Sequence, residues 1–479
     1  MILWFVILYL LASVGIGLYA ARRVHSTKDF AVAGRTLPLP VVTATVFATW
    51  FGAETVLGIP ATFVKEGLRG VVADPFGSSL CLILAGLFFA RRLYRLNVLT
   101  IGDYYRIRYN RTVEVLCTLC IVASYLGWVS AQIKALGLIF HVVTDGVVMQ
   151  PLGMVIGAAI VLTYTTFGGM FSVAILDFVQ ITVIMGGMLY IGSVIGGLTG
   201  GVAAVLTHAA SAGNLAFFPS AGIAAWIPFI GAWVTMMLGS IPQQDVFQRI
   251  TSAKDERTAV RGSVLGGSLY FFFAFVPMFL AYSATLVDPD RFGALLEKDS
   301  QLILPTLILE HTPLAAQVIF FGAVLSAIMS CSSATLLAPS VAFSENIVKG
   351  MVPGMSDPAF LRTMRTVLVC FTSVVLAFAL NSDATIFKMV EGAYKITLVS
   401  AFIPLFAGLY WPRATSLGGL LSIGSGLLTW IALELFGHSD VWPPQLVGFL
   451  IAAVGMVAGS LLTTRHETNC PPGRGSLSA

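Results

Sequence analysis

The stretch TWFGAE at residues 49–54, followed by Gly58 and Pro60, interrupts an otherwise mostly apolar run over residues 38–64. Glycine and proline both weaken a helix interior. Glu54 is a further obstacle, because a charged side chain that faces lipid costs about 2.5–3.5 kcal/mol. The run therefore predicts two half-helices joined by irregular backbone, which is tolerated at membrane depth only where it is buried in protein or lines a wet cavity.

The composition places the whole chain in a membrane. Of its 479 residues, 57% are hydrophobic and 10% are charged, whereas soluble domains have about 45–50% apolar and about 25% charged residues. The mean hydropathy is +0.89. These values exclude a soluble enzyme, a nucleic-acid-binding protein and a disordered scaffold, and they predict an all-α polytopic membrane protein.

About thirteen transmembrane helices are predicted, since roughly 20 apolar residues cross a bilayer. Their ranges are 2–20, 38–64, 70–90, 113–141, 150–167, 171–196, 225–243, 262–286, 314–345, 366–382, 386–411, 415–436 and 443–463. If successive spans cross the membrane in opposite directions, most Lys and Arg lie on one side, which is typical of the cytoplasmic face. We therefore expect a multi-pass plasma (inner) membrane protein whose N-terminus is outside and whose C-terminus is cytoplasmic. Residues 1–465 would form a single transmembrane domain, and residues 466–479 a disordered cytoplasmic tail.

A second predicted span is also unsuited to a continuous helix. The run 225–243 ends through Gly239-Ser-Ile-Pro242 into the polar residues Gln243-Gln-Asp245. It is the seventh span and the first interrupted one is the second, so the two lie five spans apart. Interrupted spans in corresponding positions of two halves indicate a transporter's binding site, and this spacing fits a five-plus-five inverted repeat. Ordinary kinks at Gly and Pro remain the alternative.

Ionisable residues within the spans should face the protein interior or a hydrated cavity. They are Glu54, Asp74, Asp177, Glu391, Lys134 and Lys395. Hydroxyl groups also gather over residues 326–333 (SAIMSCSS), and oxygen ligands suit hard cations. Two ordinary explanations stay open: charges at helix ends, and small residues that let membrane helices approach closely.

Several spaced motifs resemble those of the sodium/solute symporter family. They are YTTFGGMFSV (164–173) followed by Asp177, FGAE (51–54), LTIGDYY (99–105), GSIPQQDVFQR (239–249) and SAIMS (326–330). They occur in the family's order and cover roughly residues 1–465. The resemblance implies a leucine-transporter-type core built from spans two to eleven, with one extra helix before it and two after it.

The resemblance also implies a sodium site between the interrupted second span and the ninth span. Its ligands would be the carbonyls of Ala48, Phe51 and Ala327, the hydroxyl of Ser330 and the side chain at position 331, which is Cys331. A further sodium site in some members would use Asp177 and Ser333. Sodium, as the coupling ion, is the only metal expected, and no cofactor is implied.

Within the family, the nearest pattern is the high-affinity choline transporter branch. Trp50 and Trp128 match two tryptophans of its aromatic cage, but Gln243 stands where a third is expected. Aromatic faces attract ammonium groups, and Glu54, Glu391 and Gln243 add polar partners. We therefore expect an amine-containing solute, zwitterionic or cationic, bound by these five residues.

Lys134 argues for the opposite charge. It lies about two helical turns from Trp128 and would attract an anion, so an anionic solute remains an alternative.

The predicted function is a sodium-coupled secondary symporter that imports a small organic solute by alternating access. Its partners would be the solute, sodium and the lipid bilayer, and no nucleic acid. A proton-coupled or sodium-independent transporter of a carboxylate or another solute on the same fold is the alternative. An enzyme is not expected, because the sequence shows no phosphate-binding loop, metal-ligand cluster or nucleophile–base pair.

Overall fold

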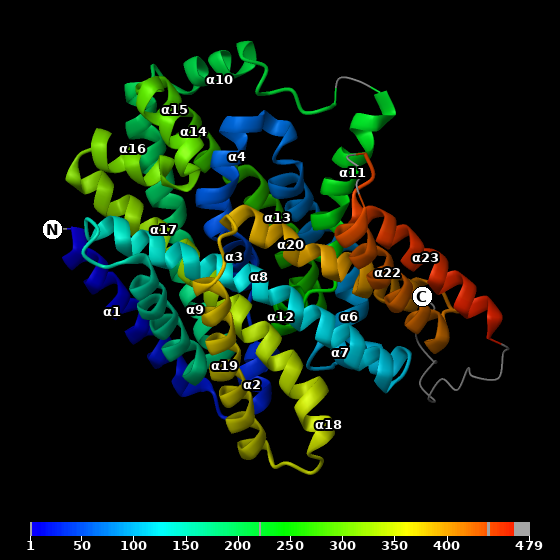
Figure 1. Cartoon of the computed structure of the whole chain (residues 1–479). Coiled ribbons are helices and arrows are strands. Elements are labelled where there is room, and N and C mark those ends of the chain that lie inside the picture. The colour runs from blue at the N-terminus through cyan, green and yellow to red at the C-terminus, as the bar shows by residue number, and fades with distance from the viewer. Residues whose placement is uncertain (1, 220–221, 438–440, 464–479) are drawn as a thin grey trace.

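The computed structural model describes residues 2–219, 222–437 and 441–463, and within them every regular element is helical. The predicted tail over residues 466–479 lies outside the described residues. The helices pack side by side, and α1 and the pair α22–α23 lie at opposite edges of the bundle (Figure 1).

Most helices are long and apolar enough to cross a membrane. They are α1 (Ile2–Ala20), α3 (Leu39–Trp50) with α4 (Ile59–Glu66), α5 (Ser78–Leu84) with α6 (Arg91–Arg95), α8 (Arg111–Val143), α9 (Gln150–Leu198), α11 (Gly222–Gly239), α13 (Glu256–Phe273) with α14 (Phe275–Val287), α17 (Leu314–Phe343), α19 (Asp357–Leu380), α20 (Ile386–Thr397) with α21 (Ile403–Tyr410), α22 (Ser416–Phe436) and α23 (Pro444–Leu462). Shorter connecting helices are α2 (Thr27–Val32), α7 (Ile101–Arg108), α10 (Val202–Ser211), α12 (Gln244–Ser252), α15 (Pro289–Lys298), α16 (Ile303–His311) and α18 (Lys349–Met351).

The second span is broken where its sequence predicts. Helix α3 ends at Trp50, a π-helical turn runs over Glu54–Gly58, and α4 continues from Ile59. The two halves are bent by 55° relative to each other. The seventh span also stops, because α11 ends at Gly239 and α12 begins only at Gln244.

Helix α9 contains two spans. Its 49 residues would measure about 74 Å as one straight helix, more than twice the thickness of the hydrocarbon core. Gly169 divides it with a non-helical conformation (φ 48°, ψ −139°). In the described part of the chain, eleven helices are long and apolar enough to span, and the bent pair adds a twelfth. Division of α9 at Gly169 brings the number to thirteen, as predicted.

The two interruptions lie in the interior of the bundle, although much of α11 itself is at the surface. Helix α3 packs against α9, α12, α13 and α17, and α8 packs against α17 and α20. Helix α1 lies against α9, whereas α22 and α23 pack mainly on each other. The breaks are therefore shielded from lipid by neighbouring helices, as irregular backbone in a membrane requires.

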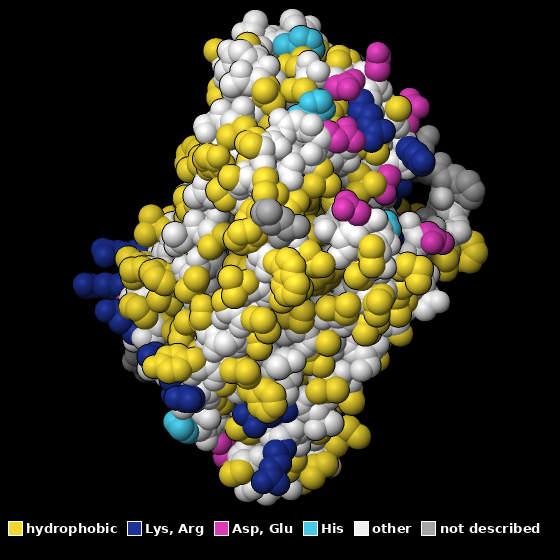
Figure 2. Space-filling model, turned by 90° about the vertical axis from the view of Figure 1, so that its left-hand side faces the viewer, with side chains coloured by type: hydrophobic (Ala, Val, Ile, Leu, Met, Phe, Trp, Pro, Cys, Tyr) yellow, Lys and Arg dark blue, Asp and Glu magenta, His cyan; other side chains and the backbone are white. Residues whose placement is uncertain are grey.

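The surface is divided into bands. Figure 2 shows apolar side chains across the middle of one face, with most Lys and Arg in the lower half and most Asp and Glu, with a few Lys or Arg, toward the upper end. This distribution suits a protein embedded in a bilayer.

Gly169 allows a test of the division of α9. A Cβ atom there would lie 2.4 Å from the carbonyl oxygen of Phe30, and its φ is one that side chains rarely adopt. Gly169→Ala should therefore destabilise the protein, with the strained backbone alone costing about 1–3 kcal/mol. The measurement is thermal unfolding of the purified protein in detergent. Gly186→Ala on the same helix is the control, because nothing lies within 4 Å of the added atom; equal losses in the two variants would contradict the prediction.

Candidate functional site

The break in the second span releases backbone groups from the helix. The amide of Gly52 donates to the carbonyl of Trp50 at 3.1 Å, and not to Ala48, its partner in a continuous α-helix. Gly52 also permits close packing, because a Cβ atom there would lie 2.8 Å from the sulfur of Cys331 and 2.9 Å from Oε1 of Gln132. The break is thus pressed between α8 and α17, with the carbonyl of Ala48 available to a ligand.

Gln132 and Trp128, on one face of α8, hold Glu54. The Gln132 side chain accepts from the amide of Ala53 at 2.9 Å and donates to Glu54 at 2.5 Å. The indole N–H of Trp128 donates to the other carboxylate oxygen at 3.0 Å. Glu54 is 2% exposed, and no basic side chain in the described residues forms an ion pair with it.

Three aromatic rings gather beside Glu54. Trp50 stacks on Tyr394 of α20 with ring centroids 5.8 Å apart, and Trp128 is tilted against both, at 5.5 and 5.4 Å. All three are buried. The Tyr394 hydroxyl has no hydrogen-bond partner among the described residues, which leaves it free for a bound molecule.

Gln243 lies at the other end of this aromatic cluster. Its amide nitrogen donates to the hydroxyl of Ser124 at 2.9 Å and to that of Thr397 at 3.4 Å. Ser124 and Gln132 are eight residues apart on α8, or about 12 Å along the helix. Glu54 and Gln243 therefore mark the two ends of one strip on α8, with Trp128 between them.

A second polar cluster forms around Asp177 on α9. Ser330 of α17 donates to one carboxylate oxygen at 2.5 Å, and Thr45 of α3 donates to the other. Ser333 instead donates to the carbonyl of Ser330 at 3.0 Å. The residues of both predicted sodium sites thus meet where α3, α9 and α17 converge. All of them are buried, including Ala48, Phe51, Ala327 and Cys331.

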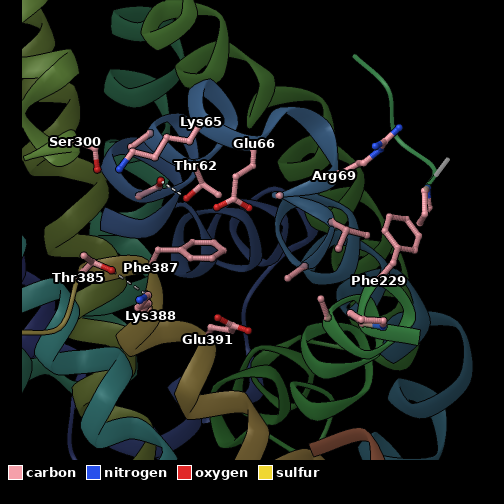
Figure 3. Close-up of a pocket in the computed structure, with 18 of the residues that line it drawn as sticks. Thr62, Lys65, Glu66, Arg69, Phe229, Ser300, Thr385, Phe387, Lys388 and Glu391 are labelled. Atoms are coloured by element: carbon pink, nitrogen blue, oxygen red, sulfur yellow. Dashed lines mark hydrogen bonds between the residues drawn. The ribbon is translucent and has the colours of Figure 1, made fainter. Parts of the chain in front are cut away.

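Glu391 does not join the aromatic cluster. It lines a large vestibule on the side of the bundle that holds α4 and the start of α20. Figure 3 shows its carboxylate below the ring of Phe387, with Glu66 on the opposite side and Lys65 and Lys388 nearby. Glu391 precedes Tyr394 by about one helical turn, so the vestibule lies just beyond the cluster.

Lys134 likewise lies apart from the tryptophans. Its ammonium group donates to the carbonyls of Ser382 and Ala384 at 3.0 and 2.8 Å. It therefore holds the segment before α20, and the anion-attracting role that its sequence position suggests has no support in its contacts.

Sequence reasoning missed three residues of this region. Gln132 follows Trp128 by four residues, so the helical i, i+4 relation could have identified it. Tyr394 carried no such signal. Arg249, 2% exposed, donates to Thr49 at 3.0 Å, a contact that its place at the end of the GSIPQQDVFQR motif does not predict.

The geometry combines a broken span, an aromatic cluster with a buried acid, and a carboxylate–hydroxyl cluster. The sequence model of the "Sodium:solute symporter family" matches residues 30–426. The chain belongs to this family. It is therefore a membrane-embedded, sodium-coupled symporter and not an enzyme, with sodium as its coupling ion.

Individual relatives agree with this membership. High-affinity choline transporter 1 of Caenorhabditis elegans is 26% identical over 86% of this chain and 74% of its own length. The sodium/glucose cotransporter of Vibrio parahaemolyticus is 22% identical over 97% and 91%. Among solved structures, an outward-open, substrate-bound Na⁺-coupled sialic acid symporter has a TM-score of 0.83 at 18% identity, with 97% of this chain and 98% of that one covered. The predicted leucine-transporter-type fold is confirmed.

Gln132 provides a test of how the break is supported. Gln132→Ala removes the partners of Ala53 and Glu54, and leaving a buried polar group unsatisfied costs about 1–3 kcal/mol. We expect a lower unfolding temperature of the purified protein. The control is Gln150→Ala, whose side chain makes one long bond of 3.5 Å to the carbonyl of Lys134; a similar loss in both variants would contradict the role given to Gln132.

Proposed function

We propose that this symporter imports a small amine-containing solute, zwitterionic or cationic, by alternating access. The observation that carries the proposal is the setting of Glu54, a buried carboxylate beside two indole rings. A carboxylate taken out of water is costly unless a positive charge accompanies it. An ammonium group on the solute supplies that charge, and the faces of Trp50 and Trp128 attract the same group.

The opposite end of the cluster favours a solute with a further polar group. Gln243 and the unpartnered hydroxyl of Tyr394 offer hydrogen bonds to a carboxylate or a hydroxyl. Such groups suit a zwitterion better than bare choline. The names of the relatives support no single solute, because a choline transporter and a glucose cotransporter both match at similar identity.

The coupling sodium is proposed to bind at the Asp177 cluster. Carboxylate, hydroxyl and carbonyl oxygens are the ligands that hard cations prefer. Asp177, Ser330 and the released carbonyl of Ala48 supply them where three spans meet, while the thiol of Cys331 is a weaker ligand. A cation there joins α3 to α9 and α17 and so biases the arrangement of the interrupted span.

The orientation is also a proposal. With the basic end of Figure 2 in the cytoplasm, the vestibule lined by Glu391 opens to the outside. Glu391 is then part of the solute's approach, one turn outside the cluster.

Ser330→Ala tests the sodium site. The loss of one bond to a charged group is worth about 1.5–3 kcal/mol, so the sodium concentration for half-maximal uptake should rise about tenfold or more. Uptake of labelled solute into proteoliposomes, measured over a range of sodium gradients, gives this value. Ser332→Ala is the control, because that hydroxyl bonds only to its own helix at Ile328. An unchanged sodium dependence in Ser330→Ala would remove Ser330 from the site.

Glu54→Gln tests the solute class. Removal of one partner of a buried charge pair costs about 2–5 kcal/mol, so the affinity for amine-containing solutes should fall about thirtyfold or more. Calorimetry on the purified protein in sodium measures it. The control is Glu434→Gln, since Glu434 also accepts from an indole, that of Trp430 at 3.1 Å, but lies on the outer helix α22. Binding of an uncharged sugar or a simple carboxylate, indifferent to Glu54→Gln, would overturn the amine assignment and leave the symporter intact.

A further inference from the structure

The interior of the protein holds more negative than positive charge. Apart from Glu114, which pairs with Arg111 at 2.8 Å, the carboxylates exposed by 2% or less are Glu54, Asp74, Asp177 and Asp245, and Arg249 is the basic residue buried to that degree among those described. Arg249 follows Asp245 by one turn of α12 but forms no ion pair with it. Sodium and the solute amine are proposed for Asp177 and Glu54, and Asp74 has no counter-charge assigned to it.

Asp74 lies in an oxygen-rich cluster of side chains from three spans. It sits at the bend before α5, and the hydroxyl of Tyr270 on α13 donates to its Oδ1 atom at 2.5 Å. Ser78 donates to the same oxygen. The Thr55 hydroxyl, just after the break in the second span, lies 2.9 Å from the Tyr270 hydroxyl and 3.2 Å from the carbonyl of Trp50.

These groups match the needs of a hard monovalent cation. One carboxylate and three hydroxyls are joined by hydrogen bonds, all of the side chains are buried, and no basic side chain of the described residues pairs with Asp74. Because Tyr270 and Ser78 both direct their protons at the carboxylate, the lone pairs of their oxygens remain available. Sodium prefers such ligands, whereas softer metals take nitrogen and sulfur.

The site lies beside the vestibule. Ala73, adjacent to Asp74, lines the vestibule that contains Glu391 (Figure 3), as does Gly58 at the end of the π-helical turn. A cation that enters the vestibule therefore reaches the wall behind which Asp74 lies.

We propose that Asp74, Ser78, Tyr270 and Thr55 form a second sodium site, on the opposite side of the break from Asp177. The proposal rests on the proposed sodium site at Asp177. Sodium at Asp177 engages the half-helix before the break through Thr45, and sodium at Asp74 engages the half after it through Thr55. Both halves of the second span are fixed only when both ions are bound, so the transport rate depends on sodium with a Hill coefficient above one.

The test is equilibrium binding of radioactive sodium to the purified full-length protein. Asp74→Asn should bind one sodium ion fewer per chain than the unaltered protein, and the Hill coefficient of uptake should fall to one. Tyr270→Phe keeps the ring and removes one ligand, so it should raise the half-saturating sodium concentration of the second ion if Asp74→Asn fails to fold. Ser79→Ala is the matched control, because Ser79 is the buried neighbour of Ser78 and bonds to the carbonyl of Pro75 at 2.6 Å.

The outcomes separate this inference from the proposed function. Asp177→Asn should also lose one sodium ion, but a different one, so the Asp74 and Asp177 variants combined should bind none. An undiminished sodium stoichiometry in Asp74→Asn overturns the second site, even if its pH dependence or solute affinity changes, since those would mark a proton site or a solute contact. No sodium binding by the unaltered protein overturns both proposed sodium sites.

Discussion

The constraint on which the structure depends is the satisfaction of backbone hydrogen bonds inside an apolar membrane. A continuous helix satisfies its own backbone groups, but the helix of the second span is interrupted between Trp50 and Glu54. The freed amide of Ala53 then needs a partner from elsewhere, and Gln132 of α8 provides it. The same side chain also donates to Glu54. Gln132 therefore both satisfies the broken helix and positions the buried acid.

Charge balance follows from the same geometry. Each buried acid near the break is held by neutral donors: the indole of Trp128 and the amide of Gln132 for Glu54, and hydroxyls for Asp74 and Asp177. Neutral donors orient a carboxylate without cancelling its charge. The protein thus keeps these acids in position, and under the proposed function the countercharge comes from the ions and the solute.

The sequence predicted what depends on local pattern. Thirteen spans and the two interruptions could be read because runs of apolar residues and their breaks at Gly, Pro and Glu54 are local properties. Trp50, Trp128 and Glu54, predicted to share a site, lie side by side in the structure, and their role in binding stays a prediction. Tyr394 and Arg249 were missed because their roles depend on which helices meet, and Glu391 and Lys134 were placed too near the cluster because their helical phase and depth were unknown. Lys134 binds carbonyls more than 240 residues away along the chain, a contact that no local pattern encodes.

The division of α9 at Gly169 couples the orientations of the fifth and sixth spans. A loop would let the two move independently, but here a single residue joins them, and the backbone of Phe30 on α2 lies against it. Asp177 is eight residues beyond this pivot, about 12 Å along the helix. A small change of angle at Gly169 would therefore displace Asp177 by a larger amount, and the contact with Phe30 ties α2 to the same point of the chain.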